Sequence, residues 1–311
     1  MLDNISITCT KVVPKADPLH GIPCSRSSHG LSMINNGTRL ILYGGEHLAR
    51  TPLNDDSQST WAADYNQQSL DCKWQWRLIL HNTTGTTPST TPPPRVGHAQ
   101  AVYNDSIVFI FGGRAGVAMN EQPMNDLWML DASGEPGTER WSEIVTEHES
   151  PSPRSFHKMI CVGNKLFVFG GCGVTGRLAD LAMFDVPTQT WTMLGTSSLL
   201  KGRGRANLLA LNSGTALAVV AGFAGEEMAD GHAFDVMKGT WADMPLTLQG
   251  LRPRSVCVSG SFPSVGVAVI FGGEVDPSDR GHEGAGGFEN DVVILDESTG
   301  TFIATKTKVR Q

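Results

Sequence analysis

One short pattern recurs along this chain of 311 residues and constrains its fold more than any other feature. The pattern is a run of β-branched, aliphatic and aromatic residues that ends in a glycine pair, as in LILYGG, VFIFGG, LFVFGG and VAVIFGG. A degenerate copy, AVVAGF, occupies residues 218–223. Apolar runs of this length, bounded by Gly, Pro, Asn or Asp, predict short strands rather than helices. Five copies therefore predict five repeats of one unit in an all-β chain.

Three further landmarks accompany each copy. An aspartate ends a second strand, namely Asp64, Asp131, Asp185, Asp235 and Asp296. An aromatic residue opens a further strand, namely Trp74, Trp141, Trp191, Trp241 and Phe302. An arginine precedes each glycine pair by 16–19 residues, namely Arg26, Arg95, Arg154, Arg205 and Arg254. The register of these landmarks predicts four strands in each repeat.

This combination resembles the kelch repeat over nearly the whole chain. The resemblance implies one kelch β-propeller domain over residues 1–311, with five recognisable four-stranded blades and a tryptophan packed between neighbouring blades. Two ways of completing the propeller stay open: the two terminal strands pair with each other, or they form a vestigial sixth blade. The tract NTTGTTPSTTPPP at 82–94 predicts a surface insertion between the first two blades.

Composition narrows the classes of partner and the compartment. The chain has 24 Lys and Arg against 31 Asp and Glu, a net charge of −7, which disfavours a broad nucleic-acid or anionic-membrane surface. No apolar run reaches the roughly 20 residues that span a bilayer, and the first residues do not read as a secretory signal. The six cysteines form no CxxC pair. We therefore expect a cytoplasmic protein with reduced thiols and no membrane or nucleic-acid partner.

The order of the repeat endings is more specific. The series YGGE, FGGR, FGGC, AGF and FGGEVDPSDRGHEGAGGF resembles the plant nitrile-specifier and thiocyanate-forming (epithiospecifier-type) proteins and their fungal relatives. Those proteins are kelch propellers that turn over unstable glucosinolate aglycones with ferrous iron. The resemblance implies that Glu274 and His282 bind Fe(II). Ser278 stands where that family has its middle aspartate, and Asp279 is displaced by one residue, with Asp276 as a second substitute.

The residues of this loop allow two interpretations by themselves. Two carboxylates and an imidazole within nine residues suit a facial Fe(II) site, or a metal-free pocket with an acid and a base. The same residues also suit a solvated acidic loop with turn-forming aspartates. We predict Glu274, Asp279 and His282 as catalytic residues and as the metal ligands if iron binds. Fe(II) is the one cofactor implied, and nothing in the residues requires a cofactor.

Arginines form the second candidate constellation. Because each blade-start arginine opens the innermost strand, these side chains are expected at the channel mouth, where guanidinium groups bind oxyanions. Glu46 and Arg114 directly follow glycine pairs and are expected on the same face. The predicted substrate-binding set is Arg26, Arg95, Arg114, Arg154, Arg205, Arg254 and Glu46. The alternative is structural: such arginines also bind loop carbonyls and acidic side chains of adjoining blades.

Three histidines continue the arginine motif as Arg-x-x-His, namely His29, His98 and His157. Matched positions in successive blades are separated by the channel, so these residues are not expected to share a metal. We expect them to form hydrogen bonds between blades, with one of them recruited as a general acid or base.

Taken as a stand-alone propeller, the chain is predicted to act on a small molecule in a pocket at the channel mouth. The expected activity is that of a lyase or cyclase in secondary metabolism, which eliminates, rearranges or cyclises a reactive intermediate without redox change. A fungal cyclase or hetero-Diels–Alder-type enzyme fits this picture as well as a plant specifier protein does. The alternative is a non-catalytic kelch scaffold that binds a protein partner.

Overall fold

The computed structural model describes residues 11–48, 51–53, 59–69, 73–80, 91–116, 121–146, 150–262, 266–276, 286–296 and 301–305. The chain divides into two compact units. The N-terminal unit comprises Lys11–Leu166 and Phe184–Trp191, and the C-terminal unit comprises Phe167–Met183 and the chain from Thr192 onward. The boundary runs through the third sheet. We describe each unit by itself, and the expectation of one domain over the whole chain stays a prediction.

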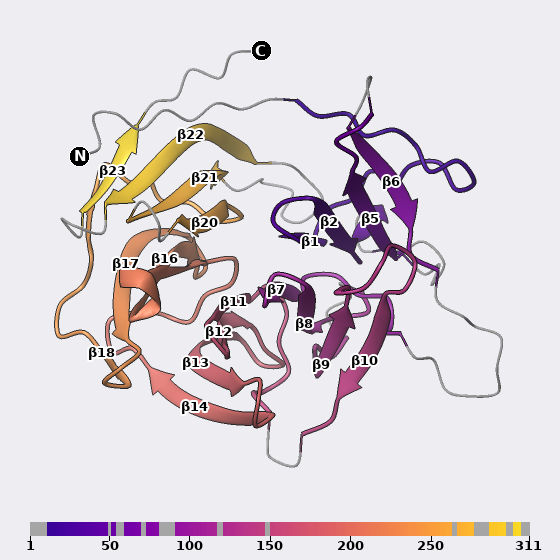
Figure 1. Ribbon diagram of the computed structural model, residues 1–311. Coiled ribbons are helices and arrows are strands. Elements are labelled where there is room, and N and C mark those ends of the chain that lie inside the picture. Colours follow the sequence, from indigo (N-terminus) through magenta and orange to yellow (C-terminus); the bar gives the residue numbers. More distant parts are fainter. Residues whose placement is uncertain are drawn as a thin grey trace. The chain divides into compact units, whose positions relative to one another are not determined.

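Five sheets follow one another along the chain (Figure 1). The first contains β1 (Gly30–Ile34), β2 (Arg39–Tyr43), β5 (Thr60–Tyr65) and β6 (Trp74–Leu78). The second contains β7 (Ala99–Tyr103), β8 (Ile107–Gly113), β9 (Met124–Asp131) and β10 (Arg140–Ile144). The third contains β11 (Lys158–Val162), β12 (Lys165–Cys172), β13 (Arg177–Asp185) and β14 (Thr190–Thr196). The fourth contains β15 (Asn207–Leu211), β16 (Ala216–Phe223), β17 (Glu227–Asp235) and β18 (Thr240–Trp241).

The fifth sheet has one strand more than the others. It contains β20 (Val258–Phe262), β21 (Val267–Asp276), β22 (Gly287–Asp296) and β23 (Thr301–Thr305) in antiparallel order, and β19 (Thr247–Gln249) adds to β23 in parallel. A short ribbon of β3 (Glu46–Leu48) and β4 (Thr51–Pro52) follows the first glycine pair. The four-stranded repeat unit predicted from the sequence is thus confirmed.

Helix is nearly absent from the described residues, as the sequence predicted. They contain a single 3₁₀ turn at Asn212–Gly214, and none of their helices is long and apolar enough to cross a bilayer. The described cysteines, Cys24, Cys161, Cys172 and Cys257, form no disulfide with one another.

The described residues include only part of the predicted terminal strands and of the predicted insertion. The terminal segments 1–10 and 306–311 lie outside the described residues, so the pairing of the terminal strands stays a prediction. Residues 81–90 of the proline-rich tract also lie outside. Its end is bound to the first sheet, because the Tyr43 hydroxyl donates to the carbonyls of Pro92 and Pro93 at 3.1 and 3.0 Å.

The glycine pair ends the second strand in a bulge in the second and fifth repeats. In β8 the register with β9 shifts between Phe111 and Gly113, and both glycines of the pair have positive φ, +59° and +98°. A Cβ atom on Gly112 would lie 2.6 Å from the carbonyl oxygen of Arg154 in the next repeat. Glycine therefore serves two needs here, a left-handed backbone and a close approach of the following repeat.

Aromatic pairs link neighbouring sheets within each unit. The residue before a glycine pair packs against the tryptophan in the fourth strand of the next repeat. The ring pairs are Tyr43–Trp141 and Phe111–Trp191, each with centroids 5.1 Å apart, and Phe169–Trp241 with centroids 6.3 Å apart. Trp141 and Trp191 are buried, at 6% and 8% exposure, whereas Trp241 is half-buried. The predicted tryptophan packing is therefore confirmed, with Trp241 the least enclosed.

The predicted aromatic position in the first repeat was wrong by two residues. In the second repeat the strand-ending Asp131 faces Arg140, and Trp141 follows. In the first repeat Asp64 faces Gln75, so Trp76 and not Trp74 occupies the matching position. Spacing alone cannot distinguish two tryptophans that lie two residues apart in one strand, because their side chains point to the same face of the sheet.

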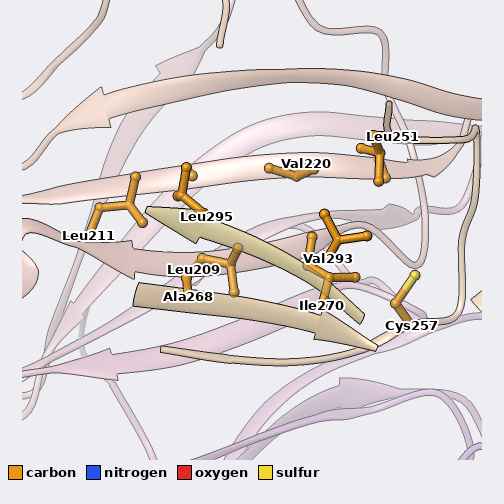
Figure 2. Packing of buried hydrophobic residues seen from close by; sticks show 11 residues of the cluster. Leu209, Leu211, Val220, Leu251, Cys257, Ala268, Ile270, Val293 and Leu295 are labelled. Carbon is orange, nitrogen blue, oxygen red and sulfur yellow. The ribbon is translucent and has the colours of Figure 1, made fainter. Parts of the chain in front are cut away.

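Aliphatic side chains fill the space between the fourth and fifth sheets of the C-terminal unit. Figure 2 shows Leu209 and Val220 of the fourth sheet packed with Ile270 and Val293 of the fifth. All four side chains are at most 1% exposed. Alternation along the strands directs these residues to one face, and neither sheet could bury that face alone.

Two of the three matched histidines are buried beside glycine pairs. His98 lies against Gly44 and packs edge-on to Tyr43, with ring centroids 5.1 Å apart. Neither of its ring nitrogens has a hydrogen-bond partner among the described residues, so the predicted bond between blades is wrong for His98. Burial, the nearby Arg95 charge and His29 lower the pKa of His98 to about 3. Burial and Arg154 likewise hold the pKa of His157 well below its ordinary value.

Replacing a buried tryptophan should destabilise the chain in proportion to its burial. We expect Trp141→Ala and Trp191→Ala to lower the free energy of unfolding by about 3–5 kcal/mol each, the usual range for deleting a large buried aromatic side chain. Trp241→Ala should cost less, because this side chain is half-exposed. Urea denaturation of the three variants checks the order, and equal losses in all three would contradict the packing described above.

The buried histidines should make the fold acid-sensitive. A histidine whose pKa is depressed in the folded chain stabilises it above the unfolded pKa of about 6.5, and this contribution is lost as pH falls towards about 3. We expect His98→Cys, which copies the residue of the fifth repeat, Cys257, to flatten the decline in melting temperature between pH 7 and pH 5. A decline as steep as in the unmodified chain would show that His98 is not its source.

Candidate functional site

The guanidinium groups of the blade-start arginines form hydrogen bonds within the protein. Arg95 is fully buried, and its Nε donates to the Pro93 carbonyl at 3.1 Å. Its Nη1 donates to the Gly112 carbonyl at 2.9 Å, and both Nη atoms reach the Asp126 carboxylate at 2.7 Å. Burial lowers the pKa of Arg95, but the Asp126 carboxylate more than offsets this, so the pKa is raised overall. This guanidinium holds its own glycine bulge to the third strand of its sheet.

The same arrangement recurs in the other repeats. Arg254 donates to the Gly272 carbonyl at 3.0 Å and to both carboxylate oxygens of Asp291 at 2.6 and 3.0 Å. Arg154 is fully buried and donates to the carbonyl and hydroxyl oxygens of Ser152. Arg26 is half-buried and donates to the Gly44 carbonyl at 3.2 Å. These four arginines therefore have the structural role that was the alternative in the sequence analysis. Their contacts do not support binding of a ligand.

In the fourth repeat the predicted arginine was displaced by two residues. Arg203, not Arg205, precedes the first strand by four residues as Arg95 does. Arg203 is fully buried and donates to the carbonyl of Ala221 at 3.2 Å and to both carboxylate oxygens of Asp230. The motif Arg-Gly-Arg offers two candidates at nearly equal spacing, and only the contacts distinguish them.

The aspartates that hold these arginines were missed in the sequence. Asp126, Asp230 and Asp291 each precede the strand-ending aspartate by five residues, as does Asp180 in the third repeat. The signal was available as a second repeated aspartate, in NDLWML, ADLAMF, ADGHAF and NDVVIL. It marks the first inward-facing residue of the third strand, where a carboxylate meets the buried guanidinium.

Glu46, Arg114 and Glu274 occupy matching positions, as predicted, together with Phe223. Each follows a glycine pair, or Ala221-Gly222 in the fourth repeat, and forms an antiparallel bridge with the residue after the blade-start arginine. The bridges are Ser27–Glu46, Val96–Arg114, Gly204–Phe223 and Ser255–Glu274. The same backbone arrangement thus presents a carboxylate in the first and fifth repeats, a guanidinium group in the second and an aromatic ring in the fourth.

The second residue after each blade-start arginine has a left-handed backbone. Values of φ lie between +54° and +63° at Ser28, Gly97, Phe156, Arg205 and Val256. These residues are linked by main-chain hydrogen bonds within each unit, from Gly97 to Ser28 at 3.0 Å and from Phe156 to Gly97 at 2.6 Å in the N-terminal unit. Non-glycine residues held in this region carry strain, which is often found at functional sites.

In the C-terminal unit, two acidic side chains lie beside these bridges. Glu227 opens β17 opposite Phe223, and the Ser255 hydroxyl donates to its Oε1 at 3.3 Å. The backbone of Ser255 also pairs with Glu274 through bonds of 2.9 and 2.8 Å. Ser255 thereby connects the two half-buried glutamates. Within the described residues, the second carboxylate oxygen of Glu227 is buried without a hydrogen-bond partner.

Electrostatics separate Glu227 from an ordinary surface carboxylate. Burial raises the pKa of Glu227 above its ordinary value, and the negative charge of Glu274 adds to this. The hydrogen bond from Ser255 and the positive charge of Arg205 oppose the rise without cancelling it. Sequence reasoning missed Glu227 because it stands in the pair Glu226-Glu227, and only strand pairing shows that Glu226 is exposed while Glu227 turns inward.

The rest of the predicted loop site cannot be placed. Asp279, His282 and Ser278 lie outside the described residues, so their convergence with Glu274 stays a prediction. Asp276 is described, and its carboxylate pairs with Arg252 at 2.9 Å at the surface. Within the described segments, no group of three or more His, Cys, Asp or Glu side chains is arranged to hold a metal ion.

Comparison with known proteins identifies the family. The model of the KLHDC2/KLHL20/DRC7 Kelch-repeats domain matches residues 73–273 of this chain. The chain is a kelch-repeat protein. The four four-stranded sheets and the five-stranded fifth sheet are therefore kelch blades, and the all-β kelch β-propeller predicted from the sequence is confirmed as the fold class.

Individual kelch relatives differ in how much of each protein is shared. Host cell factor of Drosophila melanogaster is 30% identical over 203 residues, which is 58% of this chain and 12% of that protein. Adagio-like protein 1 of Oryza sativa subsp. japonica is 34% identical over 154 residues, 48% of this chain and 21% of that protein. This kelch chain thus spans about a fifth or less of the length of these two relatives.

A third relative is similar over most of both chains. N-(sulfonatooxy)prop-2-enimidothioate sulfolyase of Thlaspi arvense is 25% identical over 303 residues, which is 89% of this chain and 78% of that enzyme. The resemblance inferred from the repeat endings is confirmed to this extent: a kelch chain similar to a plant sulfolyase.

The assignment of Arg203 rather than Arg205 to the buried cluster leads to a sharp prediction. Arg203→Ala should lower the free energy of unfolding by about 3–5 kcal/mol, because it leaves the Asp230 carboxylate without its buried partner. Arg205→Ala, a matched change two residues away, should cost much less. Chemical denaturation of both variants checks this, and a larger loss for Arg205→Ala would overturn the register.

Proposed function

We propose that this kelch chain is a redox-neutral lyase whose proton transfers are carried out by Glu227 and Glu274. The observation that carries the proposal is the pair of half-buried glutamates joined through Ser255, with Arg205 close enough to act on Glu227 electrostatically. An elimination or rearrangement needs one group that gives a proton and one that accepts a proton, and two carboxyl groups in unequal environments provide both.

The roles of the two carboxyl groups follow from their surroundings. Burial and the charge of Glu274 raise the pKa of Glu227 despite the hydrogen bond from Ser255, so Glu227 would retain its proton longer and act as the acid. Glu274 would act as the base. Arg205 would stabilise negative charge that develops on a departing group, as a guanidinium does for oxyanions.

Similarity to the sulfolyase supports this class of reaction. The aligned region includes 89% of this chain and 78% of that enzyme, so the similarity is not limited to a few repeats. By its name, that enzyme acts on N-(sulfonatooxy)prop-2-enimidothioate and is a sulfolyase. We therefore propose a small, reactive, oxyanion-bearing intermediate as the substrate class. A cyclisation, also expected from the sequence, would use the same acid and base.

Iron stays a separate hypothesis. Of the predicted ligands only Glu274 is described, and the charged group shown to interact with it is the Glu227 carboxylate. If Fe(II) binds, Glu274, Asp279 and His282 would hold it, and it would supply Lewis acidity to the substrate. The proton transfers assigned to Glu227 and Glu274 are derived without it.

The alternative is a protein-binding kelch scaffold. It is favoured by the relatives in which the shared kelch region is only 12% or 21% of the protein, since there the region is one part of a much larger chain. A scaffold would present the variable residues at the bridge positions to a protein partner and would show no turnover.

Turnover of the sulfolyase substrate tests the proposal. The purified chain is incubated with N-(sulfonatooxy)prop-2-enimidothioate, with and without Fe(II) and chelator, and released sulfate is measured against a protein-free control. We expect Glu227→Gln and Glu274→Gln to lower kcat by about 10²–10⁴-fold, the usual contribution of general acid–base catalysis. Glu226→Gln, the exposed neighbour, is the matched control and should keep full activity.

A stability measurement accompanies this test. A carboxyl group with a raised pKa stabilises the folded chain below its unfolded pKa of about 4.3 and loses this contribution as pH rises through the folded pKa. Glu227→Gln should therefore raise the melting temperature slightly at pH 7 and not at pH 4, the gain being limited by solvent screening. Full activity in both glutamine variants, or no sulfate release by the folded wild-type chain, would refute the assignment and favour the scaffold.

A further inference from the structure

Arg114, which follows the glycine pair of the second repeat, has a side chain without a hydrogen-bond partner among the described residues. The backbone of Arg114 pairs with Val96 through bonds of 2.9 and 3.0 Å, which fixes the start of its side chain. Its Nε is buried, and none of the described residues accepts a hydrogen bond from its guanidinium group. Arg95 and Arg154, by contrast, are both engaged by main-chain or side-chain acceptors. Among the six predicted arginines, Arg114 is therefore the one left available to an external anion.

An aromatic ring packs against the segment that pairs with this arginine. Phe156 has a φ of +55° and donates its N–H to the Gly97 carbonyl at 2.6 Å, and Gly97 directly follows the residue that pairs with Arg114. A Cβ atom on Gly97 would lie 2.8 Å from two carbons of the Phe156 ring. The Phe156 ring thus packs against the α-carbon of Gly97, in the space that a side chain at position 97 would fill. It is half-buried, so part of it stays accessible to a ligand.

A comparison of repeats indicates what belongs beside these two residues. At the position after the blade-start arginine, the Ser27 hydroxyl donates to Glu46 and the Ser255 hydroxyl donates to Glu227, each at 3.3 Å. The matching Ser155 has no hydrogen-bond partner among the described residues. A bond of 2.8 Å from Gly113 N–H to the Arg154 carbonyl brings Arg114 and Ser155 side by side. The Ser27 hydroxyl thus meets a carboxylate of its own repeat and the Ser255 hydroxyl meets one of the preceding repeat, whereas Ser155 meets none among the described residues.

We propose that Arg114 and Phe156 form a binding site in the N-terminal unit for an aromatic carboxylate, a planar ring that carries one carboxylate group. The carboxylate accepts two hydrogen bonds from the Arg114 guanidinium. The ligand ring packs against the Phe156 ring in an offset or edge-on arrangement. This inference does not depend on the lyase activity proposed above.

Benzoate is the probe that tests the site. Isothermal titration calorimetry of the full chain at pH 7 should give a Kd on the order of 1 mM, as expected for one ion pair and one ring contact. Benzyl alcohol, which lacks the charge, and cyclohexanecarboxylate, which lacks the aromatic ring, should bind at least tenfold more weakly. Arg114→Gln should weaken benzoate binding at least tenfold.

Two variants separate binding from folding. Phe156→Gly removes the ring and relaxes the positive φ, so it should keep the melting temperature while weakening benzoate binding at least fivefold. Arg140→Gln, on an exposed arginine of β10, is the matched control and should bind benzoate normally. Unchanged benzoate affinity in Arg114→Gln or Phe156→Gly, or no binding by the wild-type chain at 20-fold the expected Kd (about 20 mM on that estimate), would overturn the site. Glu227→Gln should bind benzoate normally, so failure of the lyase proposal can be distinguished from failure of this one.

Discussion

The structure of each unit depends on one arginine in each repeat that is bonded in two directions. Its guanidinium holds the glycine bulge and the third-strand aspartate of its own sheet, as Arg95 does with Gly112 and Asp126. Its carbonyl accepts a hydrogen bond from the glycine pair of the preceding repeat. These bonds are Gly45 N–H to Arg95 O at 3.0 Å, and at 2.8 Å each Gly113 to Arg154, Gly171 to Arg203 and Gly222 to Arg254. A buried charge of this kind persists only because every donor meets an acceptor, so bulge, aspartate and arginine must occur together.

This framework explains why the neighbouring positions can vary. The residue after each glycine pair and the residues after each arginine are fixed in backbone conformation by the bridges and by the chain of left-handed residues. Their side chains contribute little to the sheets themselves. One framework can therefore present Glu274 beside Glu227 in the C-terminal unit and Arg114 beside Phe156 in the N-terminal unit. Function in this fold is set by what stands at these positions rather than by the blades.

The two proposals use these positions for different chemistry. In the C-terminal unit two carboxyl groups share Ser255 and differ in environment, which suits proton transfer. In the N-terminal unit a guanidinium and an aromatic ring adjoin a serine without a carboxylate, which suits recognition of an anion. Similarity over 89% of the chain to a sulfolyase favours catalysis, whereas shorter matches within much larger relatives are compatible with a binding domain.

By itself, the sequence determined the repeat unit, the strands, the all-β class, the kelch family and the equivalence of Glu46, Arg114 and Glu274, because all of these follow from spacing along one chain. It placed Arg205 and Trp74 where the structure has Arg203 and Trp76, since in each case two residues of the same type stand two positions apart and spacing cannot separate them. Only the tertiary structure decided that most blade-start arginines are buried among carboxylates, that Glu227 faces Ser255, and that Arg114 lacks a partner among the described residues. The physical reason is that the availability of a charged side chain depends on which acceptors the neighbouring repeat brings to it, and this is a property of contacts rather than of local pattern.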